Sequence, residues 1–441
     1  MTSRTVTRCF FLVVLAAMTV CRTSPVRAET VVTGRVTDAS TGEPLKAAHV
    51  RVTGIRFGTI TNADGEYRLV LEKLPCEVSI SYIGYYSKVI TIDDNSPVRF
   101  DAALYPNPVM VEEVVVTPED PAVNIMREVI RRKQEWLKSL ESYSAEAYTR
   151  FTLANDTTIT MISESMSDIY WSKDTGIREV IRAKRQTENL VVKDAIASAR
   201  MVPNLYADDV DVVGHRLPGP TNPDAFDYYD FRLAARRLMD NRTVYDIEVI
   251  QKNRLQPSFT GTVSVLDSAY AMISADLKPG RGIVFPRPIL SFDITFSQQF
   301  TGEEGIWLPV DARITGVIRV GLPGLTFPPF KYNQVTRLDG YVIQAVPPDT
   351  LFTGDDTRID RTGDSDPDSL FAADNSVTVP LTAEEETAYS EIDSTFTIEK
   401  AYKPTGLLSW LVKTEVKAEN PDDPERHHGH QAATKGQSPG K

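Results

Sequence analysis

The five histidines of the chain are the side chains best suited to holding a catalytic zinc ion. A zinc peptidase needs a histidine followed at the third position by a glutamate, together with a second, distant histidine. His49 is followed by Val-Arg-Val and His215 by Arg-Leu-Pro, so neither has that glutamate. His427, His428 and His430 lie together in a polar tail. The spacing therefore argues against a zinc hydrolase, and we expect no metal site.

No other motif in the sequence supports catalysis. The chain lacks the Walker loop and the Rossmann glycine pattern, and its Gly-x-Ser-x-Gly match at residues 436–440 lies in the polar tail, not between a strand and a helix as the catalytic elbow requires. Asp364, Asp366 and Asp368 have the alternate spacing of a calcium loop, but the loop's glycine and its final glutamate are missing. We therefore expect a protein that is not an enzyme, with no cofactor and no catalytic, cofactor-binding or metal-binding residues.

The N-terminus predicts export. Arg4 and Arg8 precede an apolar run at residues 9–20, and the small residues Val26 and Ala28 mark a cleavage site. The run is roughly a dozen residues, short of the ~20 that a membrane-spanning helix needs. We expect residues 1–28 to be a signal peptide and the protein to be periplasmic or associated with the outer membrane. A retained anchor and lipidation remain weaker alternatives.

The net charge limits the classes of binding partner, and the cysteine content limits disulfide formation. Cleavage at residue 28 removes four basic and no acidic residues, so the net charge falls from −12 to −16. Such an acidic protein is expected to repel nucleic acid and anionic lipid. Cys76 becomes the one remaining cysteine, so no internal disulfide can form. We expect Cys76 to pack as a small hydrophobe beside Pro75.

Residues 29–104 read as a small β-sandwich. Seven short segments rich in β-branched residues are separated by turns: VVTGRV, AHVRVTG, FGTITN, YRLVL, EVSISY, KVITI and VRFDAAL. The turn Asn62-Ala63-Asp64-Gly65 joins the third segment to the fourth, and we expect it to be a tight hairpin with positive φ at Gly65.

These segments and turns resemble a known family. The order GRVTDASTGEPL, AHVRVTG, GTITNADGEYRL and VSISYIGYYSKVITI is similar to the carboxypeptidase regulatory-like domain, also called carboxypeptidase D regulatory-like. The resemblance covers residues 30–104. It implies a transthyretin-like sandwich that accompanies other modules and carries no catalysis of its own.

A proline-containing linker, residues 105–119, follows the sandwich. Its EEVVVT segment resembles the one that follows the same sandwich in TonB-dependent receptors. A helix is then expected from Asp120, which can cap the first turn, with Pro121 at the first helical position. Four basic residues lie mostly off its apolar stripe and are expected to be solvated: Arg127, Arg131, Arg132 and Lys133.

Residues 120–346 should form this helix plus one curved antiparallel sheet of about ten strands. Phe292, Ile294 and Phe296 alternate with polar residues, which is typical of a strand with one buried face. Hairpin turns are expected at residues 240–241 and 266–268, and a long loop at residues 201–227. This unit resembles an uncharacterised envelope family whose longer members continue into an outer-membrane β-barrel.

The remaining residues, 347–441, are acidic and poor in aromatic side chains. We expect them to be largely disordered, with a possible helix at residues 383–400. Only about thirty polar residues follow KPTGLLSWLVK, too few for a self-contained barrel of even eight strands of about ten residues each.

These features predict a mainly β, non-catalytic binding or scaffolding protein that faces the periplasm. Its expected partners are envelope proteins or an outer-membrane barrel partner, and no nucleic acid. Two alternatives stay open: a truncated or barrel-less relative of a TonB-dependent-receptor-like transporter, and a carrier of a lipid or lipoprotein ligand.

The carrier alternative follows from the width of the sheet. Ten strands spaced about 4.8 Å apart are nearly five times wider than the one predicted helix, about 10 Å across. The apolar face must therefore be closed by curling of the sheet, by the loop at residues 201–227, or by a ligand.

Overall fold

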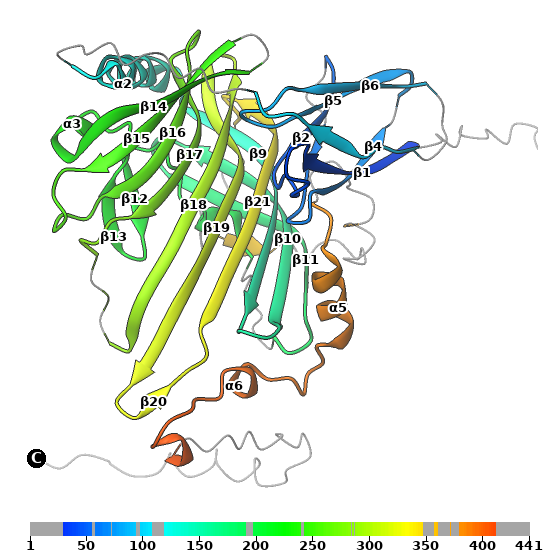
Figure 1. The fold of residues 1–441 in the computed structure, drawn as a ribbon, viewed down its shortest axis with the longest axis vertical. Coiled ribbons are helices and arrows are strands. Elements are labelled where there is room, and N and C mark those ends of the chain that lie inside the picture. Colours follow the sequence, from blue (N-terminus) through cyan, green and yellow to red (C-terminus); the bar gives the residue numbers. More distant parts are fainter. Residues whose placement is uncertain are drawn as a thin grey trace, which may run out of the picture.

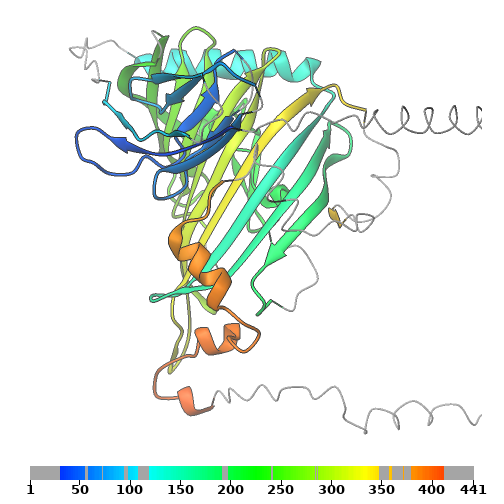
Figure 2. The same ribbon diagram turned by 90° about the vertical axis from the view of Figure 1, so that its right-hand side faces the viewer.

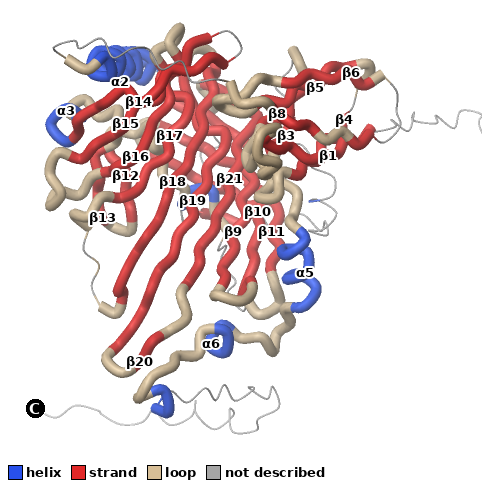
Figure 3. Tube along the Cα trace, in the orientation of Figure 1, coloured by secondary structure: helices blue, strands red, loops and turns tan. Residues whose placement is uncertain are grey.

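The computed structural model describes residues 30–411 apart from gaps at 55–57, 72, 94–97, 108–118, 191–196, 240–241, 284, 286, 347–356, 360–370 and 372–378. The predicted signal peptide, most of the predicted linker and the far end of the tail lie outside the described residues. Strands dominate the described chain, and the fold is mainly β as expected (Figure 3).

The N-terminal domain is a sandwich of two four-stranded sheets. In the first, β1 pairs antiparallel with β4 and parallel with β7 and β8. The predicted last segment, VRFDAAL, forms two short strands, so there are eight strands where seven were expected. One sheet contains β1 (Thr30–Asp38), β4 (Glu66–Leu71), β7 (Val98–Arg99) and β8 (Ala102–Leu104); the other contains β2 (His49–Val52), β3 (Gly58–Ile60), β5 (Cys76–Ser81) and β6 (Lys88–Ile92).

The turn at Gly65 has the predicted backbone but a different role. Gly65 has φ +76°, and an added Cβ would lie 2.5 Å from the Val36 carbonyl oxygen. The Asn62 side chain accepts bonds from the Asp64 and Glu66 amides at 3.0 and 2.8 Å. Because β3 and β4 belong to opposite sheets, the turn is an arch between them. The prediction of a hairpin is therefore wrong, although the predicted positive φ at Gly65 is confirmed.

Helix α2 (Pro121–Ser139) begins as predicted. The Asp120 carboxylate accepts from the Ala122 amide at 2.9 Å and from the Leu233 amide at 3.0 Å, so the cap also ties the helix to the sheet. The prediction that the basic residues are solvated is confirmed for Arg127 and Arg131. It is wrong for Lys133, which is only 1% exposed. Its ammonium donates to Asp208 at 2.5 Å and to Thr221, which compensates the buried charge.

The large sheet has twelve strands where about ten were expected. Its order is β14-β15-β16-β17-β18-β19-β21-β9-β10-β11-β22, with β20 on β19, and it is antiparallel except at β11–β22 (Figure 1). The strands are β9 (Ser142–Ala154), β10 (Ile159–Ser172), β11 (Gly176–Gln186), β14 (Tyr229–Met239), β15 (Arg242–Gln251), β16 (Phe259–Leu266), β17 (Ala271–Pro279), β18 (Ile289–Glu303), β19 (Ile306–Leu322), β20 (Leu325–Thr326), β21 (Phe330–Ile343) and β22 (Thr357–Ile359).

The two expected hairpins are present. β14 pairs with β15 and β16 with β17, both antiparallel. Residues 266–268 lie at the end of β16 and in the turn before β17, whereas residues 240–241 lie outside the described residues. In β18, Ile294 and Phe296 are buried as the period-two pattern predicts.

The segment at residues 201–227 is more than a loop. It begins within the short helix η1 (Ala199–Met201) and holds the hairpin of β12 (Asp209–Val212) and β13 (His215–Pro218), followed by α3 (Ala225–Tyr228). With α2 it covers one face of β14–β18 and shares a single apolar core with them. Of the three ways to close that face, the protein uses this segment together with the helix.

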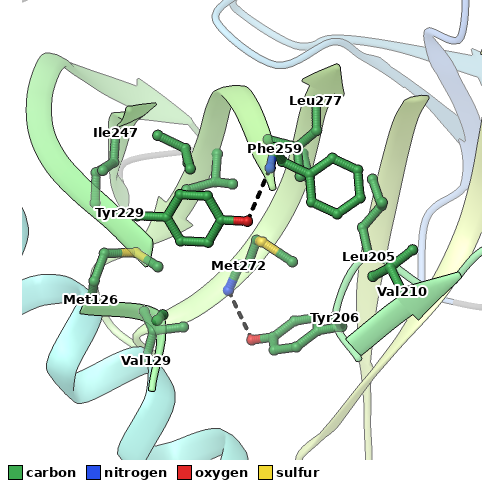
Figure 4. Close-up of a cluster of buried hydrophobic side chains, with 14 of the residues drawn as sticks. Met126, Val129, Leu205, Tyr206, Val210, Tyr229, Ile247, Phe259, Met272 and Leu277 are labelled. Atoms are coloured by element: carbon green, nitrogen blue, oxygen red, sulfur yellow. Dashed lines mark hydrogen bonds between the residues drawn. The ribbon is translucent and has the colours of Figure 1, made fainter. Parts of the chain in front are cut away.

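Two tyrosines organise this core (Figure 4). The hydroxyl of Tyr229 accepts from the Phe259 amide at 3.0 Å and donates to the Pro218 carbonyl at 2.5 Å. The hydroxyl of Tyr206 accepts from the Met272 amide at 3.0 Å. Both phenols therefore bury their rings without leaving a polar atom unpaired.

Part of the predicted disordered tail is folded. Helices α5 (Ala383–Glu391) and α6 (Ile398–Ala401) contact β10. Ala388 of α5 packs against Ile159 and Ile162, and Ile398 of α6 packs on the cluster of Met161 and Ala197. Glu385 pairs with Arg150 at 3.2 Å, and the Tyr389 hydroxyl donates to Glu164 at 2.8 Å. The expectation of disorder is wrong for residues 379–411, because buried charges on the sheet require partners from this segment.

Candidate functional site

The sandwich is docked on the outer face of the sheet, the face that α2 does not cover. Arg313 donates to the Thr61 carbonyl at 3.1 Å, and Arg337 donates to the Gly58 carbonyl at 2.7 Å. Ile60 provides an apolar contact in a cluster with buried residues of β9, β10 and β21. Arginines of the sheet thus hold backbone carbonyls of the sandwich, which lies against the sheet near one end of its strands (Figures 1 and 2).

A cleft of about 1060 Å³ opens where the sandwich, α2 and the sheet meet. We call it the arginine cleft. Its most distinctive lining residues are arginines and large aromatic side chains, drawn from segments that are far apart in sequence. They are Arg51 and Tyr82 of the sandwich, Arg131, Arg132 and Trp136 of α2, and Arg242, Tyr270 and Trp307 of the sheet domain.

The charge of the arginine cleft is opposite to that of the whole chain. Four arginines line it, and Glu135 is the one carboxylate among the lining residues. Arg131 pairs with Glu135 and with Glu128, the latter at 2.6 Å, and Arg132 pairs with Glu128 at 2.7 Å. These bonds lower the pKa of Glu128 to about 2. Two of the four arginines are therefore fixed in place by acids of α2.

The other two arginines have no such partner. Within the described chain, no carboxylate lies within ion-pair distance of Arg51 or Arg242. Burial and the nearby Arg337 lower the pKa of Arg51, although Asp339 and Glu303 act in the opposite direction. The Arg51 cation is therefore poorly compensated, and an incoming anion would stabilise it.

His49 lies in the same cleft but does not contribute charge. Its ring is hydrogen-bonded to the side chain of Gln299. Burial, reinforced by Arg51, Arg337 and Arg313, lowers the pKa of His49 to about 3, so the ring is neutral near pH 7. None of the described serine, threonine or cysteine side chains is hydrogen-bonded to this ring, which is the contact that an activated nucleophile would need.

The aromatic side chains of the arginine cleft are held rigidly. The Trp136 ring meets Tyr206 edge-on with centroids 5.6 Å apart. The Arg132 guanidinium lies 4.8 Å from the centroid of Tyr270. Immobilised rings and fixed guanidinium groups lose little entropy when a ligand binds. The arrangement is suited to binding an anion that carries a planar or apolar part.

A second polar cleft of about 540 Å³ lies under the sandwich and shares Tyr82 and Gln299 with the first. Here the charges are matched, because Arg237 pairs with Asp246 at 2.5 Å and Arg313 with Asp311 at 3.3 Å. Burial nevertheless raises the pKa of Asp311. Because its arginines already have carboxylate partners, this cleft is less suited to holding an anion.

The other residues weighed for chemistry are dispersed. His215 lies in β13 with its ring 5.7 Å from that of Phe285, and it is not among the residues that line the arginine cleft. Cys76 is half-buried against the sandwich core, and burial raises the pKa of its thiol. Asp364, Asp366, Asp368 and the three tail histidines lie outside the described residues. In the described segments, His, Cys, Asp and Glu do not gather in threes around a possible metal position.

Sequence reasoning missed the arginine cleft. His49 was weighed only as a zinc ligand, and Arg131 and Arg132 only as a solvated face. The sequence offers only a weak indication of this cleft. Its four tryptophans are rare enough to be noticed, but the residues that surround them are decided by the fold. Among the helices of the described chain, none has the length and apolar character needed to cross a membrane.

Two regions of the chain match known family models. Residues 32–116 match the model of the CarboxypepD_reg-like domain, and residues 152–327 match a family of unknown function, DUF5686. The chain therefore carries a carboxypeptidase regulatory-like domain followed by a region of an uncharacterised family. No curated protein matches the chain.

Several solved structures share a distant likeness in fold. A DUF1329 family protein from Desulfovibrio piger is 12% identical, covering 53% of this chain and 97% of that one, with a TM-score of 0.26. A putative outer membrane lipoprotein-sorting protein domain from Vibrio parahaemolyticus is 11% identical, covering 53% and 96%, with a TM-score of 0.26. A LolA superfamily protein from Nitrosomonas europaea is 13% identical, covering 53% and 97%, with a TM-score of 0.25. Such low scores carry no information on ligand or partner.

Proposed function

We propose that this protein is an exported, non-catalytic binding protein of the cell envelope, and that its ligand is an anion with a planar or apolar part. The observation that carries the proposal is the arginine cleft, where several aromatic rings lie with four arginines in an acidic protein, two of the arginines paired with acids of α2 and two without a carboxylate partner in the described chain. Arginines scattered over the surface would not indicate an anion site, because surface charges are normally balanced by nearby acids.

The chemistry of the arginine cleft suits carboxylates and phosphates. A guanidinium presents two parallel N–H donors that match two oxygens of either group. Arg51 and Arg242 have no carboxylate partner within the described chain, so they are available for such a contact. Trp136 and Trp307 lie in the same lining and provide flat apolar surface for the remainder of the ligand.

A non-catalytic role is supported by the state of His49. A general acid or base works best with a pKa near the operating pH. The His49 pKa of about 3 is far below that range, so the ring is not a proton donor near pH 7. Binding without chemistry is therefore the simpler use of the cleft.

The alternative of a lipid carrier has less support. A ligand on the apolar face of β14–β18 would have to displace α2 or the β12–β13 hairpin, whose buried side chains already fill that face. The arginine cleft needs no such displacement, because it lies at the junction of the domains and is formed in the structure.

Binding of a defined probe tests the proposal. Anilinonaphthalene sulfonate, an anionic aromatic dye, should bind the chain that lacks residues 1–28, as measured by calorimetry. The double change Arg51→Gln with Arg242→Gln should weaken this binding by about tenfold or more, because two charge-assisted contacts are lost. The matched control Arg216→Gln with Arg232→Gln removes two exposed arginines elsewhere and should leave it unchanged. Equal affinities for both variants and the parent would overturn the proposal.

Export is tested separately. The protein recovered from the periplasmic or membrane fraction should begin at Glu29 by mass spectrometry, since cleavage is expected after Ala28. Recovery of the intact chain from the cytoplasm alone would contradict the assignment to the envelope.

A further inference from the structure

The end of the sheet farthest from the sandwich carries an exposed apolar surface. The β19–β20 hairpin and the last described residues extend beyond the rest of the molecule there (Figures 1 and 2). We call this surface the tip and define it by residues 287–292, 317–327 and 403–411. Its exposed large apolar side chains are Leu290 (61%), Leu322 (47%), Leu407 (90%), Leu408 (38%) and Trp410 (73%).

These side chains belong to one surface. An added Cβ on Gly321 would lie 2.7 Å from a methyl of Leu290, and one on Gly324 would lie 2.8 Å from Leu408. The amides and carbonyls of Thr326 and Thr405 exchange two hydrogen bonds of 2.8 Å, which join the tail to the hairpin. The strand ends and the tail segment therefore present a continuous apolar patch.

The tail is fixed in this position by packing. The rings of Tyr402 and Phe330 stack with centroids 4.0 Å apart and planes within 5° of parallel. The Tyr402 hydroxyl also lies 3.1 Å from the hydroxyl of Thr160 on β10. The apolar side chains beyond Tyr402 are thus held out by an anchored segment.

The tip carries a net positive charge, although the chain as a whole is acidic. Its three segments contain Arg287, Arg319 and Lys403 and not one aspartate or glutamate. All three cations are exposed, and no described carboxylate pairs with any of them. By contrast, the chain as a whole has 12 more acidic than basic residues.

Elsewhere in the described chain, Tyr86 (54%) and Tyr105 (68%) are exposed neighbours on the sandwich, where the Tyr86 amide donates to the Tyr105 carbonyl at 3.0 Å. Leu255 (87%) and Val346 (93%) stand singly in turns and strand ends, as is normal on a protein surface. A cluster of leucines with a tryptophan, in segments that also carry three exposed cations, instead has the composition of segments that enter the interface of a bilayer.

We propose that the tip inserts into the headgroup region of an anionic lipid bilayer, with Leu322, Leu407 and Trp410 reaching the acyl boundary and Arg287, Arg319 and Lys403 contacting phosphates. The charge selects this occupant over a second copy of the chain, because two tips meeting face to face would bring six cations together. The expectation that this acidic protein repels anionic lipid then fails locally, since screening confines surface charges to about 8 Å. The inference does not depend on the arginine cleft.

Flotation with vesicles tests the inference. The chain from Glu29 onward retains every described residue and lacks the apolar run at residues 9–20, which could bind lipid by itself. It should float with vesicles of equimolar phosphatidylglycerol and phosphatidylcholine, and less with phosphatidylcholine alone. The triple variant Leu322→Ser, Leu407→Ser, Trp410→Ser should lose about tenfold or more in partitioning, because most of the buried apolar area is removed.

Two further variants separate the contributions. Leu255→Ser with Val346→Ser removes equally exposed apolar residues elsewhere and should bind like the parent. Arg287→Gln, Arg319→Gln, Lys403→Gln should abolish the preference for phosphatidylglycerol and the weakening by salt.

A spectroscopic measurement guards against misfolding of the triple variant. Lipids brominated on the acyl chain should quench the fluorescence of the parent protein but not that of Trp410→Phe, which retains the other three tryptophans. Failure of the parent to float, or equal flotation of the tip and control variants, would overturn the proposal. Tip-dependent dimerisation in sedimentation, without lipid binding, would assign the surface to a second copy instead.

Discussion

The two faces of the large sheet are used in opposite ways. Under α2, the face of β14–β18 is filled by apolar side chains from the helix and from the β12–β13 hairpin, with tyrosine hydroxyls satisfying backbone groups. On the outer face, arginines of the sheet donate to carbonyls of the sandwich, and polar clefts remain at the boundary between the two domains. The first face forms a packed core, whereas clefts remain on the second.

This difference has a physical cause. Apolar side chains fill space closely because they have no partners to orient. Arginines instead need specific oxygen acceptors, and between those acceptors gaps remain that water or a ligand can occupy. A domain docked through polar contacts therefore leaves clefts that a packed core does not.

The largest expected effect lies in the filled face. Phe259→Ala removes a ring that is fully buried in the core and should destabilise the protein by about 3–5 kcal/mol. Denaturant unfolding should show the loss as a lower midpoint with a similar slope. A loss below about 1 kcal/mol would mean that this face is less tightly packed than described.

A pH titration should distinguish the outer face. The pKa of His49 falls from an ordinary 6.5 to about 3 in the fold, so the unfolded chain binds a proton that the folded chain does not. The contribution of His49 to stability is therefore complete above pH 6.5 and is lost as the pH falls toward 3, by about 1.4 kcal/mol for each pH unit. His49→Gln should flatten this slope, measured by unfolding midpoints from pH 7 to 4. An unchanged slope would show that His49 is not desolvated.

A smaller effect is expected when one hydroxyl is removed from the filled face. Tyr229→Phe keeps the buried ring but leaves the Phe259 amide and the Pro218 carbonyl without their partner. The cost should be about 1–3 kcal/mol, since buried backbone groups become unsatisfied. Hydrogen exchange at the Phe259 amide should accelerate in the variant, while exchange in β1 and β4 of the sandwich stays the same.

The smallest effect is expected for a single docking contact. Arg337→Gln removes the 2.7 Å bond to the Gly58 carbonyl and should weaken docking of the sandwich by about 1–2 kcal/mol. Exchange should increase in β2 and β3, without a comparable change in the core around Phe259. Equal acceleration in both regions would show that the two faces unfold as one unit and that the distinction drawn between them is wrong.

Local features of the fold were predictable because their causes are local. Asp120 and Pro121 begin α2 as capping chemistry requires, and Ile294 and Phe296 are buried as the period-two pattern of β18 requires. The turn at Gly65 was predicted in its backbone but not in its topology. Sequence specifies positive φ there, whereas only the pairing of strands decides whether a turn is a hairpin or an arch.

The folded tail illustrates where composition misleads. Its acidic residues predict disorder, yet Glu385 and Tyr389 are held on the sheet by Arg150 and Glu164. Burial alone would raise the pKa of Glu164, but Arg150 and Arg185 keep it below its ordinary value. These partners lie more than 200 residues from α5 in sequence, so no local window contains the reason for its order.

The sequence by itself determined the β-sandwich, the capped helix, the alternating strands and the absence of recognisable catalytic motifs, because each depends on residues within one or two turns of chain. The tertiary structure alone decided the arginine cleft and the tip. Arg51, Trp136 and Arg242 meet only because the sandwich docks beside the end of α2, and the tip exists only because the tail returns to the β19–β20 hairpin. Both surfaces result from long-range packing, and the spacing of residues along a chain carries no record of which distant segments will meet.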